Sequence, residues 1–237
     1  ELGIADNTYV ILSADNGGSP YDRRNPLFLK MIDFQPYVDN IKKGIGANNP
    51  PDFTAPDDCL PVNYPLRGCK QWLFEGGIRV PFIVRGPGVK ADSWSHVPVV
   101  LSDLLPTLVD LASGDTEPPE LPEEIDGKSF RVLLENDGKG SMARENLPGI
   151  LWHRPLHGTR MTCYRTGQFK LVLVRDFDNR IITRHLYDLS ADISEQNDLA
   201  KKMPEKVEQM TRQVERFLTD VDAEVPVRPK PRKPQPK

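Results

Sequence analysis

The stretch Thr8–Gly18, TYVILSADNGG, decides the fold of this chain. Its run Tyr9–Leu12 is apolar without a break and rich in β-branched and aromatic residues. Such a run is typical of a strand buried on both faces of a parallel sheet. Polar residues and glycines follow it directly. Because ligands bind beyond the carboxyl ends of the strands in open α/β sheets, we expect Asp15 and Asn16 to line a binding site.

Asp15 and Asn16 carry the oxygen donors that Ca²⁺ or Mg²⁺ prefers, and the glycines after them permit a sharp turn. The alternative is a β-hairpin, because Asn-Gly is a common two-residue hairpin turn. A hairpin needs a second alternating strand, whereas residues 19–26 contain two prolines and no alternation. The local pattern alone leaves both the metal site and the plain turn open.

Composition sets the outer limits of function. The chain has 237 residues and a net charge of −3, which gives no general reason to bind nucleic acid. Its three cysteines are too few for a disulfide scaffold, although the spacing allows a Cys59–Cys69 bridge. No apolar run approaches the roughly 20 residues of a membrane span. Glu1–Ile4 lacks the features of a signal peptide and leads straight into a strand, so we expect a chain cut from a longer protein.

A second informative stretch is Leu66–Pro81, LRGCKQWLFEGGIRVP, which is followed by an apolar strand at 82–84. Residues 19–65 between the two stretches are rich in proline, asparagine and aspartate. A segment of that length with little regular pattern is typical of a functional loop, and we interpret it as a wall of a substrate cleft.

Six motifs occur in one order and span nearly the whole chain: SADNGG, LRGCK, EGGIRVPFIVRGPG, SDLLPTLVDLA, IDGKSF and HLYDLSADISEQNDLA. Together they resemble the C-terminal half of a sulfatase, the formylglycine-dependent family within the alkaline phosphatase superfamily. The resemblance implies an α/β fold, with a mixed, largely parallel sheet sandwiched by helices. A small C-terminal antiparallel sheet with a packed helix would follow it.

The resemblance also implies roles for three residues. Asp15 and Asn16 match the pair that ligates a divalent cation, usually Ca²⁺, with Mg²⁺ also possible. Lys70 matches the lysine of an LRxxK segment that contacts the sulfate group. A fixed cation and an ammonium group stabilise the negative charge that builds up during hydrolysis, and lysine suits a compact contact of this kind.

The residues around Lys70 have supporting roles in this interpretation. We expect the glycines of Glu75–Gly77 to form a tight turn and Arg79 to pair with a carboxylate that braces the loop. Arg67 could contact an anion or form a surface ion pair, and the sequence leaves both open.

The nucleophile of the family is missing from the chain. Formylglycine is made from the first residue of a C/S-x-P-x-R segment, and Cys59 is followed by Leu-Pro-Val-Asn instead. The aspartate pair that completes the family's metal shell would lie before Glu1. Two ligands are too few for Ca²⁺, which takes about 6 to 8 oxygens. The resemblance implies that the parent protein hydrolyses carbohydrate or aryl sulfates outside the cytoplasm. Because the nucleophile and half of the metal shell are missing, we predict that this chain alone is inactive.

Helical periodicity appears in two places. Ser102 is a suitable N-cap for a helix over 102–112, and Ser113-Gly114 would end it. Its apolar residues should pack on the sheet. They are Leu104, Leu105, Leu108, Leu111 and Ala112. A second helix over 204–221 begins with a proline in its first turn and carries an apolar stripe that reads as core. That stripe is Met203, Val207, Met210, Val214, Phe217, Leu218 and Val221.

Between these helices, short runs at 160–165, 169–175 and 181–187 predict an antiparallel meander. Pro155 breaks any helix that would carry His153 and His157 on one face, so a loop is expected there. In sulfatases, loops of the C-terminal subdomain can reach the cleft. The resemblance therefore makes His153, His157 and Arg160 candidate substrate contacts.

These patterns predict three segments. Residues 1–148 form the C-terminal part of the catalytic domain, 149–224 form the small α+β subdomain, and 225–237 form a basic, proline-rich disordered tail. The expected partners are a sulfated small molecule or glycan and the missing N-terminal half of the same domain. Two alternatives stay open: a phosphodiesterase or phosphonate hydrolase of the same superfamily, and a non-catalytic anion-binding remnant. Intact Asp15, Asn16 and Lys70 argue against the remnant.

Overall fold

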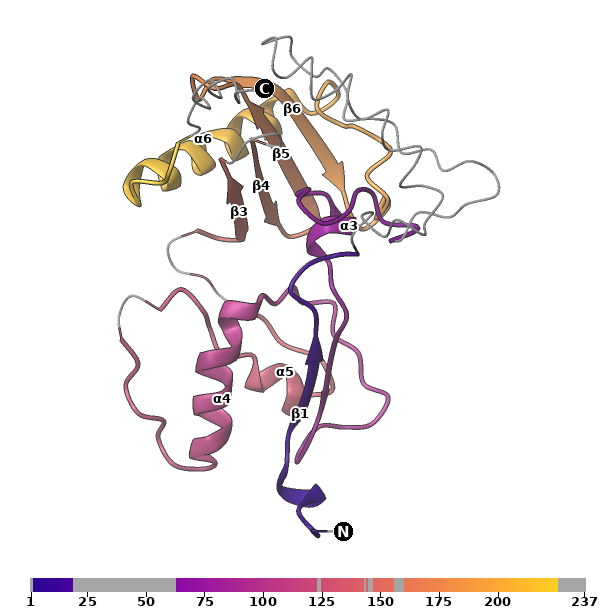
Figure 1. Ribbon diagram of the computed structural model, residues 1–237, viewed down its shortest axis with the longest axis vertical. Helices are drawn as coiled ribbons and strands as arrows, with labels where there is room; N and C mark the ends of the chain where they lie inside the picture. The colour runs from indigo at the N-terminus through magenta and orange to yellow at the C-terminus, as the bar shows by residue number, and fades with distance from the viewer. Residues whose placement is uncertain are drawn as a thin grey trace, which may run out of the picture. The chain divides into compact units, whose positions relative to one another are not determined.

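The computed structural model describes residues 2–18, 63–122, 125–142, 144, 147–155 and 160–225. Most of the predicted cleft wall, Cys59, His157 and almost all of the basic tail lie outside these ranges. The chain divides into two compact units (Figure 1). Unit 1 comprises Glu1–Ala14 and Pro81–Pro148, and unit 2 comprises Asp15–Val80 and Gly149–Lys237. The domain boundaries expected from the sequence stay predictions.

The described residues of unit 1 form two strands, two α-helices and two 3₁₀ turns. In chain order these are η1 (Ala5–Asn7), β1 (Val10–Ser13), β2 (Phe82–Arg85), η3 (Leu101–Asp103), α4 (Leu104–Ser113) and α5 (Arg131–Glu135). The strand expected at 82–84 is confirmed as β2.

Strand β1 differs from its prediction. It pairs antiparallel with β2, with Val10 opposite Arg85 and Ser13 opposite Phe82. Its side chains alternate in exposure, and Val10 and Leu12 are each more than half exposed. A strand is buried on both faces only where other elements cover both of them. Among the described residues, β1 has one neighbouring strand, so the expectation of a buried strand in a parallel sheet is wrong for this structure.

Helix α4 also differs from its prediction at its start and on its buried face. It begins at Leu104, so Asp103 rather than Ser102 occupies the N-cap position, and its side chain does not cap the helix. The buried residues of the helix are Pro106 and Thr107, whereas Leu105 and Leu108 of the predicted apolar face are exposed.

A polar network explains that orientation of α4. Thr107 Oγ1 donates to Asp103 O at 2.6 Å and accepts the Phe130 N–H at 3.0 Å. Arg144 binds both carboxylate oxygens of the fully buried Asp103, at 3.0 and 2.7 Å. Buried polar groups need their partners, and here they take precedence over the apolar stripe. The predicted helix end is confirmed, because Gly114 follows α4 with a φ of +59°.

Unit 2 is built on a four-stranded antiparallel sheet in the order β3-β4-β5-β6. The strands are β3 (Ile150–Arg154), β4 (Met161–Thr166), β5 (Phe169–Arg175) and β6 (Ile181–Asp188). The last three confirm the predicted meander. Strand β3 was not predicted, and His153 lies in it rather than in a loop. It is short, polar towards its end and followed by Pro155, so its pattern is hard to distinguish from an irregular segment.

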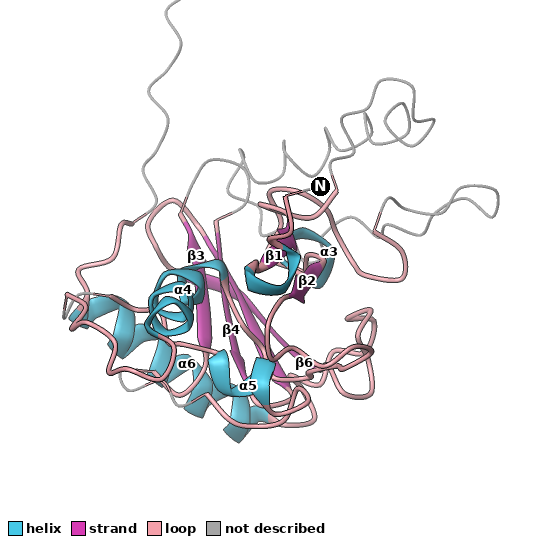
Figure 2. Cartoon of the chain, turned by 90° about the horizontal axis from the view of Figure 1, so that it is seen from below, coloured by secondary structure: helices cyan, strands magenta, loops and turns pink. Residues whose placement is uncertain are grey.

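Helix α6 (Pro204–Asp220) contacts β5 and β6, as expected for a helix packed on the small sheet (Figures 1 and 2). Val207, Met210 and Val214 are buried, which confirms the centre of the predicted stripe. Val221 lies beyond the helix end and is about half exposed. None of the helices in the described ranges has both the length and the apolar character that crossing a membrane requires.

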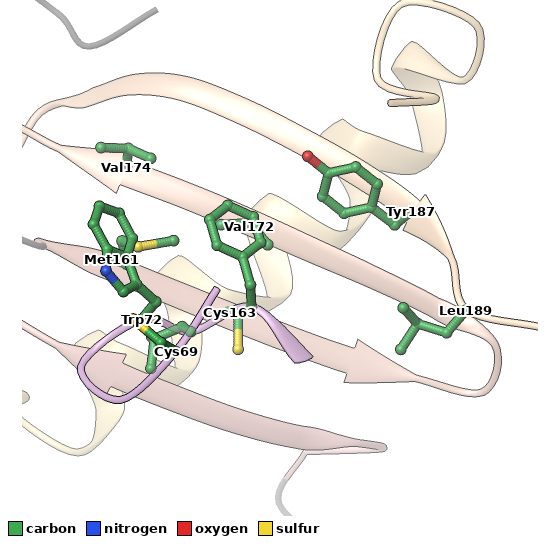
Figure 3. Close-up of a cluster of buried hydrophobic side chains, with 10 residues drawn as sticks. Cys69, Trp72, Met161, Cys163, Val172, Val174, Tyr187 and Leu189 are labelled. Atoms are coloured by element: carbon green, nitrogen blue, oxygen red, sulfur yellow. The ribbon is translucent and has the colours of Figure 1, made fainter. Parts of the chain in front are cut away.

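The segment 69–74 also contributes side chains to the hydrophobic core of unit 2. Cys69, Trp72, Leu73 and Phe74 are buried together with side chains of the sheet and of the residue that follows β6 (Figure 3). These partners are Met161, Cys163, Val172, Val174, Tyr187 and Leu189. The short α3 (Glu75–Ile78) continues directly from this segment.

The packing of α6 leads to a stability prediction. Met210→Ala should lower the free energy of unfolding by about 2–5 kcal/mol, because Met210 is 1% exposed and its removal leaves a cavity. Gln209→Ala, at an exposed position of the same helix, is the control and should change it by less than about 0.5 kcal/mol. Urea unfolding measures both variants. An equal loss of stability in the two would contradict the burial of Met210 against the sheet.

Candidate functional site

Residues Asn16–Gly18 lie against the segment that contains Lys70. Lys70 N donates to Gly18 O at 3.0 Å, and Gly17 N donates to Gly77 O at 3.0 Å. The side chain of Asn63 joins the two segments, because Gly18 N donates to Asn63 Oδ1 at 2.8 Å and Asn63 Nδ2 donates to Gly68 O at 3.1 Å. The structure therefore holds the backbone that follows Asn16 against the backbone of Lys70 and of α3.

The glycines of this site are needed for close packing of backbones. A Cβ at Gly17 would lie 1.8 Å from Gly76 O, and one at Gly77 would lie 2.0 Å from Trp72 O. Neither distance is compatible with a side chain of any size. Gly17 therefore lets its own backbone approach the Gly76 carbonyl, and Gly77 lets α3 approach the carbonyl of Trp72.

The chemical groups at the site remain accessible. Asp15 is exposed, and Asn16 and Lys70 are half-buried. Asp15 Oδ1 accepts the Asn16 N–H at 3.0 Å, and Asn16 Nδ2 donates to Gly17 O at 3.0 Å. Within the described ranges, the Lys70 ammonium forms no hydrogen bond or ion pair. These three side chains keep enough exposure to be reached from solvent.

Below this surface, Glu75 lies in a buried ion cluster. Lys170 Nζ lies 2.9 Å from Glu75 Oε1, and Arg79 Nε donates to Glu75 Oε2 at 2.7 Å. The expected pairing of Arg79 with a carboxylate is confirmed. Burial alone would raise the pKa of Glu75, but the charges of Lys170 and Arg79 outweigh it and hold that pKa below its usual value.

Glu195 completes the cluster. Its Oε1 lies 2.8 Å from Lys170 Nζ, and its Oε2 accepts the Glu75 N–H at 2.7 Å. Burial raises the pKa of Glu195 despite the neighbouring Lys170. We call Lys170, Glu75, Glu195 and Arg79 the Lys170 cluster.

Sequence analysis missed Lys170 and Glu195. A lysine inside the otherwise apolar strand FKLVLV was the available signal for the first. The second lies within the last of the six motifs, where nothing in the pattern distinguishes a buried carboxylate from a surface one.

Among the described residues, Arg67 contacts uncharged groups of unit 2. Its Nη1 donates to the Tyr187 hydroxyl and to Glu195 O, both at 3.0 Å, and its guanidinium lies 4.3 Å from the centre of the Phe74 ring. Cys69 is a buried free thiol in this structure.

The other candidate contacts already have protein partners. The ring nitrogens of His153 lie 2.8 Å from Thr162 Oγ1 and 2.8 Å from Glu224 O. Arg160 is 4% exposed, and its Nε donates to Arg175 O at 2.9 Å. Its guanidinium also lies 3.8 Å from the centre of the Phe177 ring. These contacts of His153 and Arg160 lie on the sheet of unit 2 and on the segments next to it, and none of them involves Lys70. His157 lies outside the described residues.

Comparison with known proteins identifies the family. A family model described as N-sulphoglucosamine sulphohydrolase, C-terminal, matches residues 69–224, and one described as Sulfatase matches residues 1–114. The first match spans well over half of the chain, and the chain belongs to the sulfatase family. The resemblance to sulfatases that the six motifs carry is thereby confirmed.

Two curated relatives illustrate the similarity. An uncharacterised sulfatase from Schizosaccharomyces pombe is 30% identical over 216 residues, which are 86% of this chain and 36% of that protein. Arylsulfatase K from Mus musculus is 31% identical over 146 residues, which are 57% of this chain and 24% of that protein. The chain thus spans about a quarter to a third of the length of these relatives.

Solved structures give the same result for the fold. One, reported under the metabolism of multiple glycosaminoglycans by Bacteroides thetaiotaomicron, is 25% identical with a TM-score of 0.58, over 91% of this chain and 40% of that chain. Another, in complex with its substrate D-glucosamine-2-N,6-O-disulfate, is 26% identical with a TM-score of 0.51, over 64% and 31%. The α/β, alkaline phosphatase-like fold class is confirmed.

The family implies a divalent metal, and the donors of this chain fit part of such a site. Asp15 and Asn16 offer hard oxygen ligands at an accessible position. In the described ranges, three or more His, Cys, Asp or Glu side chains do not gather anywhere in a way that could hold a metal ion. Two oxygen donors therefore represent a share of a coordination shell, not all of it.

The packing of the glycines can be tested directly. Gly17→Ala should lower the free energy of unfolding by about 3 kcal/mol or more, because its Cβ would clash with the Gly76 carbonyl. Gly167→Ala is the control, since nothing lies within 4 Å of its Cβ and only its φ of +55° causes strain, of about 1–2 kcal/mol. Urea midpoints measure both. A smaller loss for Gly17→Ala than for Gly167→Ala would contradict the close approach.

The lowered pKa of Glu75 predicts an acid-dependent stability. Ionised Glu75 stabilises the fold above its unfolded pKa of about 4.3, and this contribution is lost as pH falls through the lower folded pKa. Glu75→Gln should therefore lower the free energy of unfolding by about 3 kcal/mol near neutral pH. This loss should become smaller as the pH falls below about 4. Urea unfolding of both proteins from pH 3 to 7 measures the difference. A difference in unfolding free energy between wild type and Glu75→Gln that does not change with pH would contradict an ionised, stabilising Glu75.

Proposed function

We propose that this chain is part of a sulfatase that hydrolyses sulfate esters of carbohydrate or aryl substrates. The formylglycine nucleophile would come from outside residues 1–237. One observation supports the proposal: the Lys70 N–H donates to Gly18 O at 3.0 Å, so the backbone of the proposed sulfate-binding lysine is bonded two residues after Asn16, a proposed metal ligand. Because the chain belongs to the sulfatase family, we interpret this arrangement as part of a site for a sulfate ester.

The proposed role of Lys70 follows from the charge of the substrate. Hydrolysis of a sulfate ester builds negative charge on the bridging oxygen and on the transferring group. The ammonium of the half-buried Lys70 is proposed to bind those oxygens and to stabilise their charge. Water would have to reorganise to give the same stabilisation, whereas a fixed ammonium does not.

Asp15 and Asn16 are the proposed ligands of a divalent cation, Ca²⁺ in preference to Mg²⁺. Both are hard oxygen donors, and a flexible mixture of carboxylate and amide oxygens suits Ca²⁺. When bound, such a cation supplies positive charge next to the sulfate oxygens. The residues of this chain contribute the ligands and keep them beside Lys70 through the bond from Lys70 N to Gly18 O.

A sulfated glycan is the proposed substrate class. This is supported by the solved relative in complex with D-glucosamine-2-N,6-O-disulfate and by the family model named for N-sulphoglucosamine. Sulfated glycans of this kind occur outside the cytoplasm, and we place the protein there. Substrate contacts of His153, His157 and Arg160 remain predictions, testable as increases in KM on alanine substitution.

Kinetics of the complete protein tests the proposal. Lys70→Ala should lower kcat/KM for a sulfated glucosamine by about 10²–10³-fold, because one fixed donor to the developing charge is lost. Lys90→Ala removes another lysine, whose side chain is 65% exposed, and should leave the rate unchanged. Asp15→Asn should weaken Ca²⁺ binding, measured by calorimetry. Equal rates for Lys70→Ala and wild type, or faster turnover of phosphate esters than of sulfate esters, would contradict the proposal.

A further inference from the structure

Glu195 holds both ends of the loop that carries Lys70. At the start of the loop, Arg67 Nη1 donates to the main-chain oxygen of Glu195 at 3.0 Å. At its end, the Glu75 N–H donates to Glu195 Oε2 at 2.7 Å. Lys70 lies between these two points in the chain. One residue from the loop after β6 therefore fixes the position of the whole segment 67–75.

The second carboxylate oxygen of Glu195 connects this clamp to the sheet. Glu195 Oε1 lies 2.8 Å from Lys170 Nζ, and the same ammonium lies 2.9 Å from Glu75 Oε1. Lys170 is in β5 and is 0% exposed, as is Glu195. Lys170 thus joins the loop after β6 and the start of α3 to a central strand of the sheet.

The geometry of Glu195 itself is unusual for an ordinary structural residue. Its φ is +54°, in the left-handed region that favours glycine. Its N–H donates to Asp192 O at 3.2 Å, and the Asn197 N–H is held by Asp192 Oδ2 at 2.6 Å, which stabilises the turn. Strained backbone and a buried charge both cost free energy, and they are retained here at the point where the Lys70 loop is attached.

A continuous set of contacts leads from the Lys170 cluster to the site. Gly76 N donates to Arg67 O at 2.7 Å, which closes the loop on itself. Gly77 O then accepts the Gly17 N–H, and Lys70 N donates to Gly18 O, each at 3.0 Å. A displacement of Glu75 would therefore move Gly77, and with it the backbone of the predicted metal ligands relative to Lys70.

We propose that Lys170 and Glu195 are positioning residues that hold Lys70 in register with Asp15 and Asn16. Neither touches the substrate; both act through Glu75 and Arg67. The inference rests on the proposed function for the sulfate contact of Lys70. The small C-terminal sheet is therefore a working part of the site, because it supplies the charges that fix the loop.

Amide hydrogen exchange of the 237-residue chain tests the positioning without any assay of activity. Glu195→Gln keeps the size of the side chain and removes its charge. We expect exchange at the Lys70 and Gly77 amides to be at least about tenfold faster, because local opening becomes easier. Exchange at Val174 in β5 and Met210 in α6 should stay within about twofold of wild type. Glu208→Gln, which breaks the exposed Arg212–Glu208 pair, is the matched control and should leave all four amides unchanged.

A second variant keeps the test valid if Glu195→Gln does not fold. Lys170→Met combined with Glu195→Gln removes one positive and one negative charge and leaves the Glu75–Arg79 pair intact. Unchanged exchange at Lys70 and Gly77 in the variant that folds would overturn the proposal. So would an equal acceleration at Val174 and Met210, since that would show a general loss of stability.

Kinetics of the complete protein provides a readout that a purely structural role would not change. The folded variant should lower kcat for a sulfated glucosamine about tenfold or more with KM changed little, because the loosened lysine is misplaced in the transition state. An unchanged kcat would overturn the proposal. Wild-type protein without sulfatase activity would overturn the proposed function instead, and the exchange result would stand independently.

Discussion

The ion pairs of Lys170 with Glu75 and Glu195 are the interaction on which the candidate site depends. A buried lysine is costly unless carboxylates surround it, and here two do so from different parts of the chain. The charges are paired only when the loop after β6, α3 and β5 are all in place, so the ion pairs favour this one arrangement of the three segments. Asp15 and Lys70 are more exposed to water than Lys170, so their charges do not require buried partners.

Much of unit 2 was predictable because its patterns are local and periodic. The three longer strands, helix α6 and the supporting role of Arg79 follow from alternation, helical spacing and motif order. Asp15, Asn16 and Lys70 were proposed as site residues from motifs that put polar groups at a turn, and their roles stay predictions. Lys170 and Glu195 were not, because their partner Glu75 lies about a hundred residues away in sequence. No local pattern records a contact of that kind.

Unit 1 shows where local pattern fails. An apolar run does not say how many neighbours its strand has, and β1 has one in the described part of the chain. The apolar stripe of α4 was real in sequence, but the buried Asp103 and Thr107 required partners, and these set the orientation of the helix. The satisfaction of buried polar groups depends on long-range geometry, which single-residue hydrophobicity does not contain.

The segment 69–74 has a consequence for how this protein can be divided. Trp72 and Phe74 cover a face of the C-terminal sheet, although about 75 residues of other sequence separate them from β3. The C-terminal unit is therefore a discontinuous domain, assembled from two stretches of chain. A fragment starting at Gly149 would contain every strand of the sheet and still expose its core to water. A boundary chosen from the strands alone would cut through the hydrophobic interior.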